Sequence, residues 1–306
     1  MRWIRKTRST RPTPPTLSAW QEQNLAAISR RLAAGRAARP GIVHEQVSAY
    51  NHIVVRRTTQ QLLLCYRHPD SQIEETESRL DPDDPLVLPS AYTQAMLLAL
   101  IWQPQPRRIL LIGLGGGRLQ MVLHHYLERV TLHTVELDPL VVALAERFFG
   151  IVQDERQRII VQDGRDYLRR AAGRLSYDLI LLDAYRVEGV PRHLSTHEFY
   201  TECRACLAPG GVLATNLHSG IPGYAAARAT FETAWPHTAV FPVFGGNVVA
   251  VGGELAALAA PAFSARLSLV EQHFLGHLSL SRLASGRDSR ASAGKTGRIL
   301  HDTDQP

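Results

Sequence analysis

Glycines and carboxylates follow four apolar segments in the middle of the chain, and together they could bind a nucleoside. Residues 113–117 read Gly-Leu-Gly-Gly-Gly directly after the apolar residues 109–112, and glycine lets a backbone turn tightly and approach a ligand closely. Glu136 ends the next apolar segment, where a carboxylate can accept hydrogen bonds from both hydroxyls of a ribose. Asp163 and Asp183 end the two segments after that. This pattern favours a site for an adenine nucleoside.

Each of these features alone is weak evidence, because acids at strand ends also cap helices. Two phosphate-binding patterns are excluded. The NAD fingerprint G-x-G-x-x-G needs a glycine where this chain has Arg118, and no G-x-x-x-x-G-K-[ST] is present. The acids therefore suit an adenosine that carries an uncharged thioether or a sulfonium, whose positive charge a carboxylate-rich pocket stabilises.

The elements that must position these residues alternate between apolar strands and amphipathic helices. Five strands are predicted, at residues 109–112, 130–135, 159–161, 179–182 and 212–215, followed by a closing strand pair at 240–243 and 247–251. Apolar strands that alternate with helices indicate a parallel sheet covered on both faces. The predicted fold class is a doubly wound, Rossmann-like α/β sheet, in which ligands bind beyond the carboxyl ends of the strands.

Changes in composition divide the chain into four predicted parts. Residues 1–40 are a basic, partly disordered tail, in which Ser18 caps a short amphipathic helix. Residues 41–105 are a small N-terminal β unit with a linking helix. Residues 106–260 are the nucleoside-binding domain, and residues 261–306 are a C-terminal helix and a disordered tail.

One helix of the nucleoside-binding domain contains two cysteines. A capping box of Ser195 and Glu198 is predicted to open this helix, which spans 195–207. Cys203 and Cys206 form a C-x-x-C inside it. A redox C-x-x-C needs the helix N-terminus, where the dipole lowers the thiol pKa. We therefore expect a structural role for both cysteines.

Charge and hydropathy argue against nucleic-acid and membrane partners. The formal net charge is +6, but residues 1–40 hold nine Lys and Arg against one acid, and residues 282–306 hold five against three. Residues 41–281 are therefore left at −4, whereas phosphate binding needs cations on the folded body. No apolar run approaches the ~18 residues that span a bilayer. We expect a cytoplasmic protein, and the thirteen histidines show no spacing that predicts a metal site.

The chain from residue 109 to 149 resembles the spermidine/spermine synthase family. The motifs that match are the glycine loop, Val-Glu-Leu-Asp-Pro at 135–139, Gln-Asp-Gly at 162–164, Tyr-Asp-Leu-Ile at 177–180, and Asp183. Residues 49–53 are similar to the family's Tyr-Gln-x-Ile strand, and residues 70–72 to its Gln-containing hairpin. The resemblance spans about residues 45–250, and it implies the fold of S-adenosylmethionine-dependent methyltransferases.

The resemblance implies roles for the matching residues. Glu136 would hold the ribose, and Asp163, followed by Gly164, would hold the adenine amino group. The remaining cofactor-binding positions would be Asn51, which stands where the family has a glutamine, and Gly113, Gly115 and Gly116. The cofactor would be decarboxylated S-adenosylmethionine or S-adenosylmethionine, used as a co-substrate. The family's usual homodimer is also implied.

Asp183 matches the family's proton acceptor and also lies against the cofactor. An amine that attacks the carbon beside a sulfonium must lose a proton, and a positioned carboxylate can take it. Asp183 is therefore the predicted catalytic residue, with a small molecule as the acceptor.

The acceptor side departs from the family pattern. The glycine loop of the family continues Asp-Gly, but here Arg118 and Leu119 follow; the loop after the fourth strand normally contains a second acid, but here it reads Asp183-Ala184-Tyr185-Arg186. A like charge at about 4 Å from a polyamine nitrogen costs ~1 kcal/mol in water and ~4 kcal/mol at an effective dielectric of 20. Arg118 and Arg186, with Tyr185, are therefore predicted to disfavour an ordinary diamine.

Three functions remain open at this point. The first is a spermidine synthase-like transferase with an unusual acceptor. The second is an S-adenosylmethionine-dependent methyltransferase, because the same pocket accepts that molecule. The third is a non-catalytic nucleoside-binding or assembly protein. Residues 188–194 are predicted to cover the site as a lid in each case.

Overall fold

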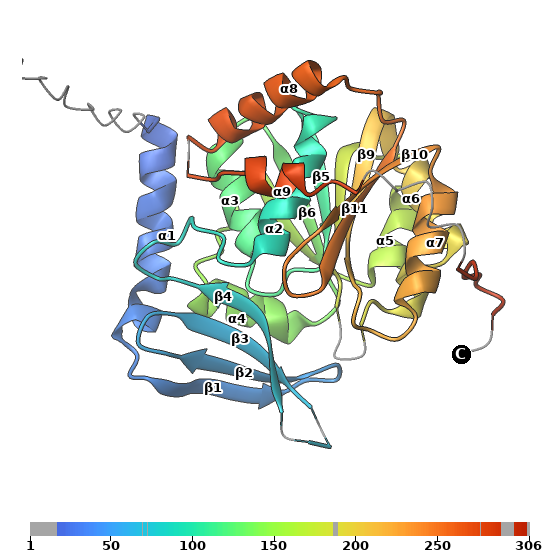
Figure 1. The fold of residues 1–306 in the computed structure, drawn as a ribbon. Coiled ribbons are helices and arrows are strands. Elements are labelled where there is room, and N and C mark those ends of the chain that lie inside the picture. Colours follow the sequence, from blue (N-terminus) through green and yellow to red (C-terminus); the bar gives the residue numbers. More distant parts are fainter. Residues whose placement is uncertain are drawn as a thin grey trace, which may run out of the picture.

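The computed structural model describes residues 17–68, 70–71, 73–185, 189–275, 277–288 and 297–304. It contains a seven-stranded sheet and a separate four-stranded sheet (Figure 1). The large sheet has the strand order β10-β11-β9-β8-β5-β6-β7. Its strands are β5 (Arg108–Ile112), β6 (Thr131–Glu136), β7 (Gln157–Val161), β8 (Tyr177–Leu182), β9 (Leu207–His218), β10 (His237–Pro242) and β11 (Asn247–Gly253).

The five strands from β5 to β9 are parallel, and β11 pairs antiparallel with both β9 and β10. This arrangement confirms the predicted α/β class and the predicted closing strand pair. The sequence of strand β5 is continuously apolar because both of its faces are buried. Ile109 and Leu111 pack into one hydrophobic cluster, whereas Leu110 and Ile112 pack into another on the opposite face. Both faces are therefore covered, as expected for a parallel sheet.

Helices lie on both faces of this sheet (Figure 1). One cluster contains side chains of α3 (Arg118–Tyr126), α4 (Pro139–Phe148) and α8 (Ala260–His273), together with the pair α2 (Ala91–Met96) and η1 (Leu97–Ile101). The other contains side chains of α5 (Gly164–Ala171), α6 (His197–Ala205) and α7 (Tyr224–Ala234). Two further helices are short: η2 (Arg192–Leu194) and α9 (Ser281–Ser285).

The N-terminal sheet is an antiparallel meander of β1 (Gly41–Val47), β2 (His52–Arg57), β3 (Leu62–Arg67) and β4 (Glu74–Leu80). The apolar residues 53–55 and 62–66 predict its two central strands, β2 and β3. The outer strands β1 and β4 contain many polar side chains, so their sequences do not show the apolar pattern that predicts a strand. Helix α1 (Ala19–Ala37) begins with the predicted cap, Ser18, whose side chain accepts a hydrogen bond from the Gln21 amide at 3.1 Å.

Two local predictions are wrong. The cap of α6 is Thr196, whose hydroxyl accepts from the Phe199 amide, whereas the Ser195 hydroxyl donates to the Arg192 carbonyl. Glu198 accepts from the Asp302 amide, so it forms no capping box with Ser195. The predicted disordered C-terminal tail is also incorrect for residues 297–304, which hydrogen bond to α6 and α7.

Cys203 lies in α6 and Cys206 is its C-terminal cap, and the surroundings of both fit the expected structural role. Both Cys203 and Cys206 are free thiols buried in the core, and burial raises the pKa of Cys206 to about 11.

Among the described residues, no helix is both long enough and apolar enough to cross a membrane.

Candidate active site

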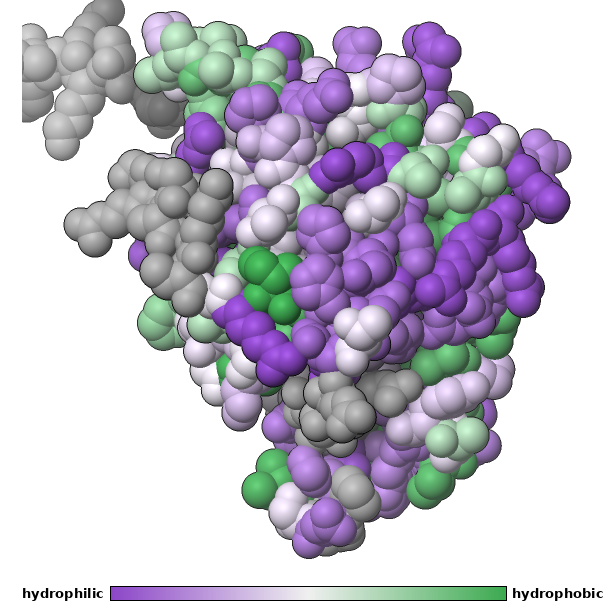
Figure 2. All heavy atoms as spheres, turned by 90° about the vertical axis from the view of Figure 1, so that its right-hand side faces the viewer, coloured by the Kyte–Doolittle hydropathy of each residue, from purple (hydrophilic) through white to green (hydrophobic). Residues whose placement is uncertain are grey.

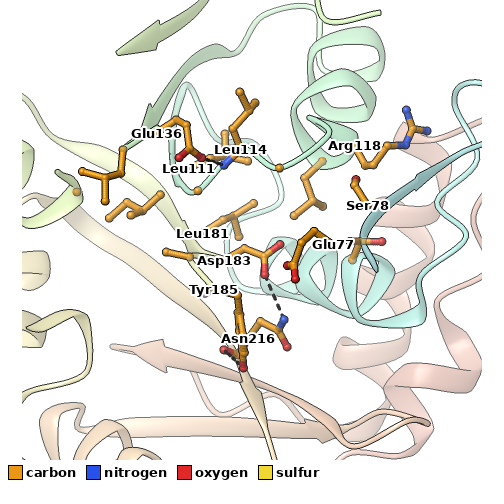
Figure 3. Close-up of a pocket in the computed structure, with 18 of the residues that line it drawn as sticks. Glu77, Ser78, Leu111, Leu114, Arg118, Glu136, Leu181, Asp183, Tyr185 and Asn216 are labelled. Carbon is orange, nitrogen blue, oxygen red and sulfur yellow. Dashed lines mark hydrogen bonds between the residues drawn. The ribbon is translucent and has the colours of Figure 1, made fainter. Parts of the chain in front are cut away.

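A cavity of about 470 Å³ lies at the carboxyl ends of β5, β6 and β8, where the doubly wound architecture predicts a ligand. Strand β4 of the N-terminal sheet forms the opposite wall (Figure 3). The cavity is therefore built from both sheets. Its lining includes Gly113 and Gly115 of the glycine loop and the three strand-end acids that the sequence singled out, but not the predicted Gly116.

Glycine is required in the loop by close packing as well as by backbone geometry. Gly113 has a φ of +102°, and a Cβ there would come 2.2 Å from the Asp183 carbonyl oxygen. A Cβ on Gly116 would come 2.6 Å from the Ser78 hydroxyl of β4. Gly115 has a φ of +53° with open space around it. The loop can therefore lie directly against both walls of the cavity.

The Glu136 carboxylate is held by the backbone of two neighbouring segments. Its Oε2 accepts from the Leu114 amide and its Oε1 accepts from the Asp138 amide, both at 2.9 Å. Burial raises the pKa of Glu136, while these backbone hydrogen bonds oppose the rise. Each oxygen keeps a second lone pair for a ligand hydroxyl. The arrangement fixes both carboxylate oxygens at the edge of the glycine loop.

Asp163 is both the cap of α5 and a neighbour of the loop 189–194. Its Oδ1 accepts from the Arg165 and Asp166 amides at 2.9 and 3.0 Å, and its Oδ2 accepts from His193 Nε2 at 2.9 Å. Burial raises the pKa of Asp163, but the hydrogen bonds outweigh burial and the net shift is downward. Oδ2 is therefore the oxygen with capacity for a ligand amino group. Gly164 packs tightly, since a Cβ there would come 2.5 Å from Ile112.

Asp183 lies deep in the cavity (Figure 3). Burial raises its pKa to about 6, although hydrogen bonds with Asn216 and Tyr92 lower it. The Asn216 amide donates to Asp183 Oδ1 at 3.1 Å and in turn accepts from the Asn247 amide at 3.0 Å. A carboxyl whose pKa lies near neutrality can gain and lose a proton at physiological pH.

Glu77 of β4 is a further acid in this cavity, and the sequence did not single it out. Its carboxyl group points toward Asp183 (Figure 3). Burial, followed by repulsion from Asp183 and Glu75, raises the pKa of Glu77 to about 7. Within the described part of the chain, its carboxylate has no hydrogen bond or ion pair. The pair Glu77–Asp183 concentrates negative charge that a bound cation would relieve.

Arg118 lines the cavity with its stem but directs its guanidinium away from Asp183 (Figure 3). The guanidinium donates to the carbonyl oxygens of Pro85 and of Val87, the latter at 2.8 Å. Burial lowers the pKa of Arg118 to about 10. The positive charge of Arg118 therefore faces the segment that links the two sheets. The predicted repulsion of a polyamine assumed instead that this charge faces the cavity.

The other predicted residues are placed as follows. Asn51 lines the cavity and donates to Asp138 Oδ2 at 3.3 Å. Tyr185 also lines it and donates to the Asn216 carbonyl at 3.2 Å. Arg186, Glu188 of the predicted lid and Gln72 of the predicted hairpin lie outside the described residues.

The sequence did not identify Asn216, His193 or Glu77 as site residues. It held a weak indication for the first two. Asn216 is a polar residue inside the otherwise apolar run 212–217, and polar residues buried in a strand are usually hydrogen bonded. His193 lies in the predicted lid, but its pairing with Asp163 depends on the path of the loop. Glu77 has no distinguishing signal, because acids surround it in the sequence of β4.

The fold is an α/β domain of the methyltransferase type, and the acids at its strand ends line one cavity. Residues 91–221 match the family model of the spermine/spermidine synthase domain. This part of the chain is therefore similar to spermine/spermidine synthase domains.

Two relatives show what this part of the chain is similar to. A polyamine aminopropyltransferase of Vibrio vulnificus is 35% identical over 193 residues, which are 63% of this chain and 64% of that protein. The chain thus spans less than two thirds of that relative. The eEF1A lysine and N-terminal methyltransferase of Bos taurus is 31% identical over 134 residues, 39% of this chain and 19% of that protein.

The fold extends beyond these matches. The crystal structure of a probable spermidine synthase from Corynebacterium glutamicum superimposes with a TM-score of 0.67 at 20% identity, covering 86% of this chain and 98% of that one. The likeness in fold therefore covers most of the chain.

Proposed function

We propose that the cavity binds an adenosyl sulfonium, either S-adenosylmethionine or its decarboxylated form, and that the protein transfers an alkyl group from its sulfur to an amine. The observation that supports this most strongly is the convergence of Glu136, Asp163 and Asp183 on one cavity. Glu136 would accept the ribose hydroxyls and Asp163 Oδ2 the adenine amino group. The third acid, Asp183, is then left for the reaction.

The chemistry needs one base and no further reactant. The lone pair of the acceptor nitrogen attacks the carbon attached to the sulfonium, the carbon–sulfur bond breaks, and its electron pair stays on sulfur as a thioether. An acceptor that binds as an ammonium has no lone pair, so it gives one proton to Asp183 before the attack, and the product nitrogen then carries the positive charge that the sulfonium loses. A decarboxylated donor leaves methylthioadenosine, and a methyl transfer leaves S-adenosylhomocysteine.

Glu77 supports an amine as the acceptor. It faces Asp183 from the opposite wall, and the guanidinium of Arg118 is bound to backbone carbonyls instead of the cavity. An ammonium group between the two carboxylates would gain ~4 kcal/mol from each at 4 Å and an effective dielectric of 20, before its desolvation is subtracted. The acids that the family places at positions 118 and 186 are still absent, so an ordinary diamine has no second anchor among these residues.

Methyl transfer is the second candidate, because part of the chain is similar to an eEF1A lysine and N-terminal methyltransferase. Both candidates use the same attack by nitrogen at a carbon beside sulfur. They differ only in the donor that is consumed. The donor is therefore the quantity to measure.

The experiment has two stages. Binding of S-adenosylmethionine, its decarboxylated form and methylthioadenosine is measured first by calorimetry. Each donor is then incubated with putrescine, spermidine or a lysine-containing peptide, and products are identified by mass. Transfer of an aminopropyl or a methyl group selects the first or the second candidate. Binding without turnover would favour a non-catalytic nucleoside-binding protein, and no binding would overturn the proposal.

A matched pair of variants tests the acceptor side. Glu77→Gln should raise the KM for the amine about tenfold and leave donor affinity unchanged, because a neutral amide loses the attraction to an ammonium. Glu155→Gln removes the same charge at an exposed position outside the cavity and should change neither quantity. An unchanged amine KM in Glu77→Gln would contradict the role of Glu77.

A further inference from the structure

Residues 297–304 lie against helices α6 and α7. The Leu300 amide donates to the Thr230 hydroxyl of α7 at 2.8 Å, and the Leu300 carbonyl accepts from the His197 amide of α6 at 2.9 Å. This segment lies on the face turned toward the viewer in Figure 2, which is largely hydrophilic. Backbone hydrogen bonds therefore attach Leu300 to both helices.

Arg165 connects this segment to the site. Its side chain is only 6% exposed, and it makes paired hydrogen bonds with two carboxylates. Asp302 accepts from the Arg165 guanidinium at 2.6 and 2.7 Å, and Glu202 accepts at 2.8 Å through each oxygen. Paired, charge-assisted hydrogen bonds of this kind fix both position and orientation.

The remaining donor capacity of Arg165 is directed to the loop 189–194. Arg165 Nη1 donates to the His193 carbonyl at 3.2 Å. Asp302 also accepts from the hydroxyl of Thr196, the residue that caps the next helix, at 2.8 Å. The buried Arg165 thus holds the middle of η2, and the Asp302 carboxylate holds Thr196, two residues beyond the end of η2.

The side chain of His193 completes the connection. Its Nε2 donates to Asp163 Oδ2 at 2.9 Å, and this is the oxygen with spare acceptor capacity, since Oδ1 already accepts from two amides. We propose that residues 297–304 act as a clasp that positions His193 against Asp163, so that the orientation of Oδ2, and with it the recognition of the adenine amino group, depends on Arg165 and Asp302.

Arg165 and Asp302 are positioning residues in this proposal, because neither would touch the ligand. The inference rests on the proposed nucleoside site. It goes beyond that site by making selectivity for the base depend on a segment more than 100 residues away in sequence. A loosened clasp would leave the glycine loop and Glu136 intact. The predicted defect is therefore specific to the base and does not extend to the ribose.

The test compares methylthioadenosine with methylthioinosine, which lacks the 6-amino group. The unmodified chain should prefer methylthioadenosine by roughly tenfold to a hundredfold, the range expected for one hydrogen bond to a charged group. In Asp302→Asn this ratio should fall to about threefold or less, mainly through weaker binding of methylthioadenosine. A general loss of structure would instead weaken both nucleosides equally and leave their ratio unchanged.

Two further variants sharpen the result. Arg298→Gln breaks an exposed pair with Asp304 in the same segment without touching Arg165, and it should keep the full ratio. His193→Ala should reduce the ratio as Asp302→Asn does, and the double variant should show no additional loss, because both changes act through one contact.

Each outcome is decisive. An unchanged ratio in Asp302→Asn, or tighter binding of methylthioadenosine, overturns the clasp while the proposed nucleoside site stands. Additive effects in the double variant also overturn it, since the clasp would then act by another route. Failure of the unmodified chain to bind either nucleoside overturns the proposed function together with this inference.

Discussion

The side-chain amide of Asn216 donates a hydrogen bond to Asp183 Oδ1 at 3.1 Å, and this contact orients a carboxyl group whose pKa is raised to about 6. Asn216 comes from β9 and Asp183 follows β8, so the contact depends on the parallel pairing of these two strands. A base that is both oriented and close to neutrality in pKa is what proton removal from an amine requires.

Asp183→Asn should lower kcat by about 10²- to 10⁴-fold, the usual contribution of a general base. The affinity for methylthioadenosine should change less than about threefold, because the amide keeps the shape of the carboxylate. Turnover assays and calorimetry on the same preparation check both parts. An equal loss of binding and turnover would show that Asp183 only holds the nucleoside.

The pH dependence of the reaction should reflect the same group. Since Asp183 must be ionised to accept a proton, kcat/KM for the donor, at saturating amine, should fall below pH about 6 and level off above it. Asn216→Leu removes a hydrogen bond that lowers the pKa of Asp183, so the break in the profile should move to higher pH. A break that does not move would separate Asn216 from the titration of Asp183.

Glu77→Gln should stabilise the protein at alkaline pH. The pKa of Glu77 is raised to about 7 in the fold from an ordinary value of 4.5, mainly by burial. The stability that its protonated form contributes is complete below pH 4.5 and is lost as the pH rises through 7. The variant should therefore gain about 1–3 kcal/mol in free energy of unfolding at pH 8 and little at pH 4.5.

Urea unfolding at both pH values measures this difference. The exposed control Glu155→Gln should show no such dependence on pH. A variant at position 77 that is less stable than its parent at pH 8 would indicate that the carboxylate has a stabilising partner. The expected combination of greater stability with weaker amine binding would mark Glu77 as a functional residue.

Glu136→Ala should abolish measurable nucleoside binding, with a loss of affinity of more than about a hundredfold. The substitution removes the ribose acceptor and also frees the Leu114 and Asp138 amides, which shape the glycine loop. Glu136→Gln retains one acceptor oxygen and should lose less. Affinity retained in the alanine variant would disprove the ribose role.

Arg118→Met should destabilise the fold by about 1–3 kcal/mol without improving amine binding. The guanidinium is buried and donates to the carbonyl oxygens of Pro85 and Val87, which would lose their charged donor. Thermal unfolding measures the first effect and the amine KM the second. An amine KM that falls markedly in this variant would restore the view that Arg118 repels the acceptor.

The sequence alone determined the large sheet and the three acids at its strand ends. Continuous apolar strands leave only an arrangement covered on both faces, and parallel strands bring their carboxyl ends to one edge. Glu136, Asp163 and Asp183 were therefore predictable as neighbours from local patterns. The same holds for the Ser18 cap, which needs only residues within one turn.

The tertiary structure decided the rest, because those contacts join residues far apart in the chain. The direction of the Arg118 side chain depends on the carbonyl groups of the linking segment, and Glu77 reaches Asp183 only because the N-terminal sheet closes the cavity. The pairing of Arg165 with Asp302 spans 137 residues. Residue type and spacing do not encode such pairings, since long-range contacts are set by packing. The strand-end acids were thus visible in the sequence, whereas the approach of Glu77 to Asp183 and the pairing of Arg165 with Asp302 were not.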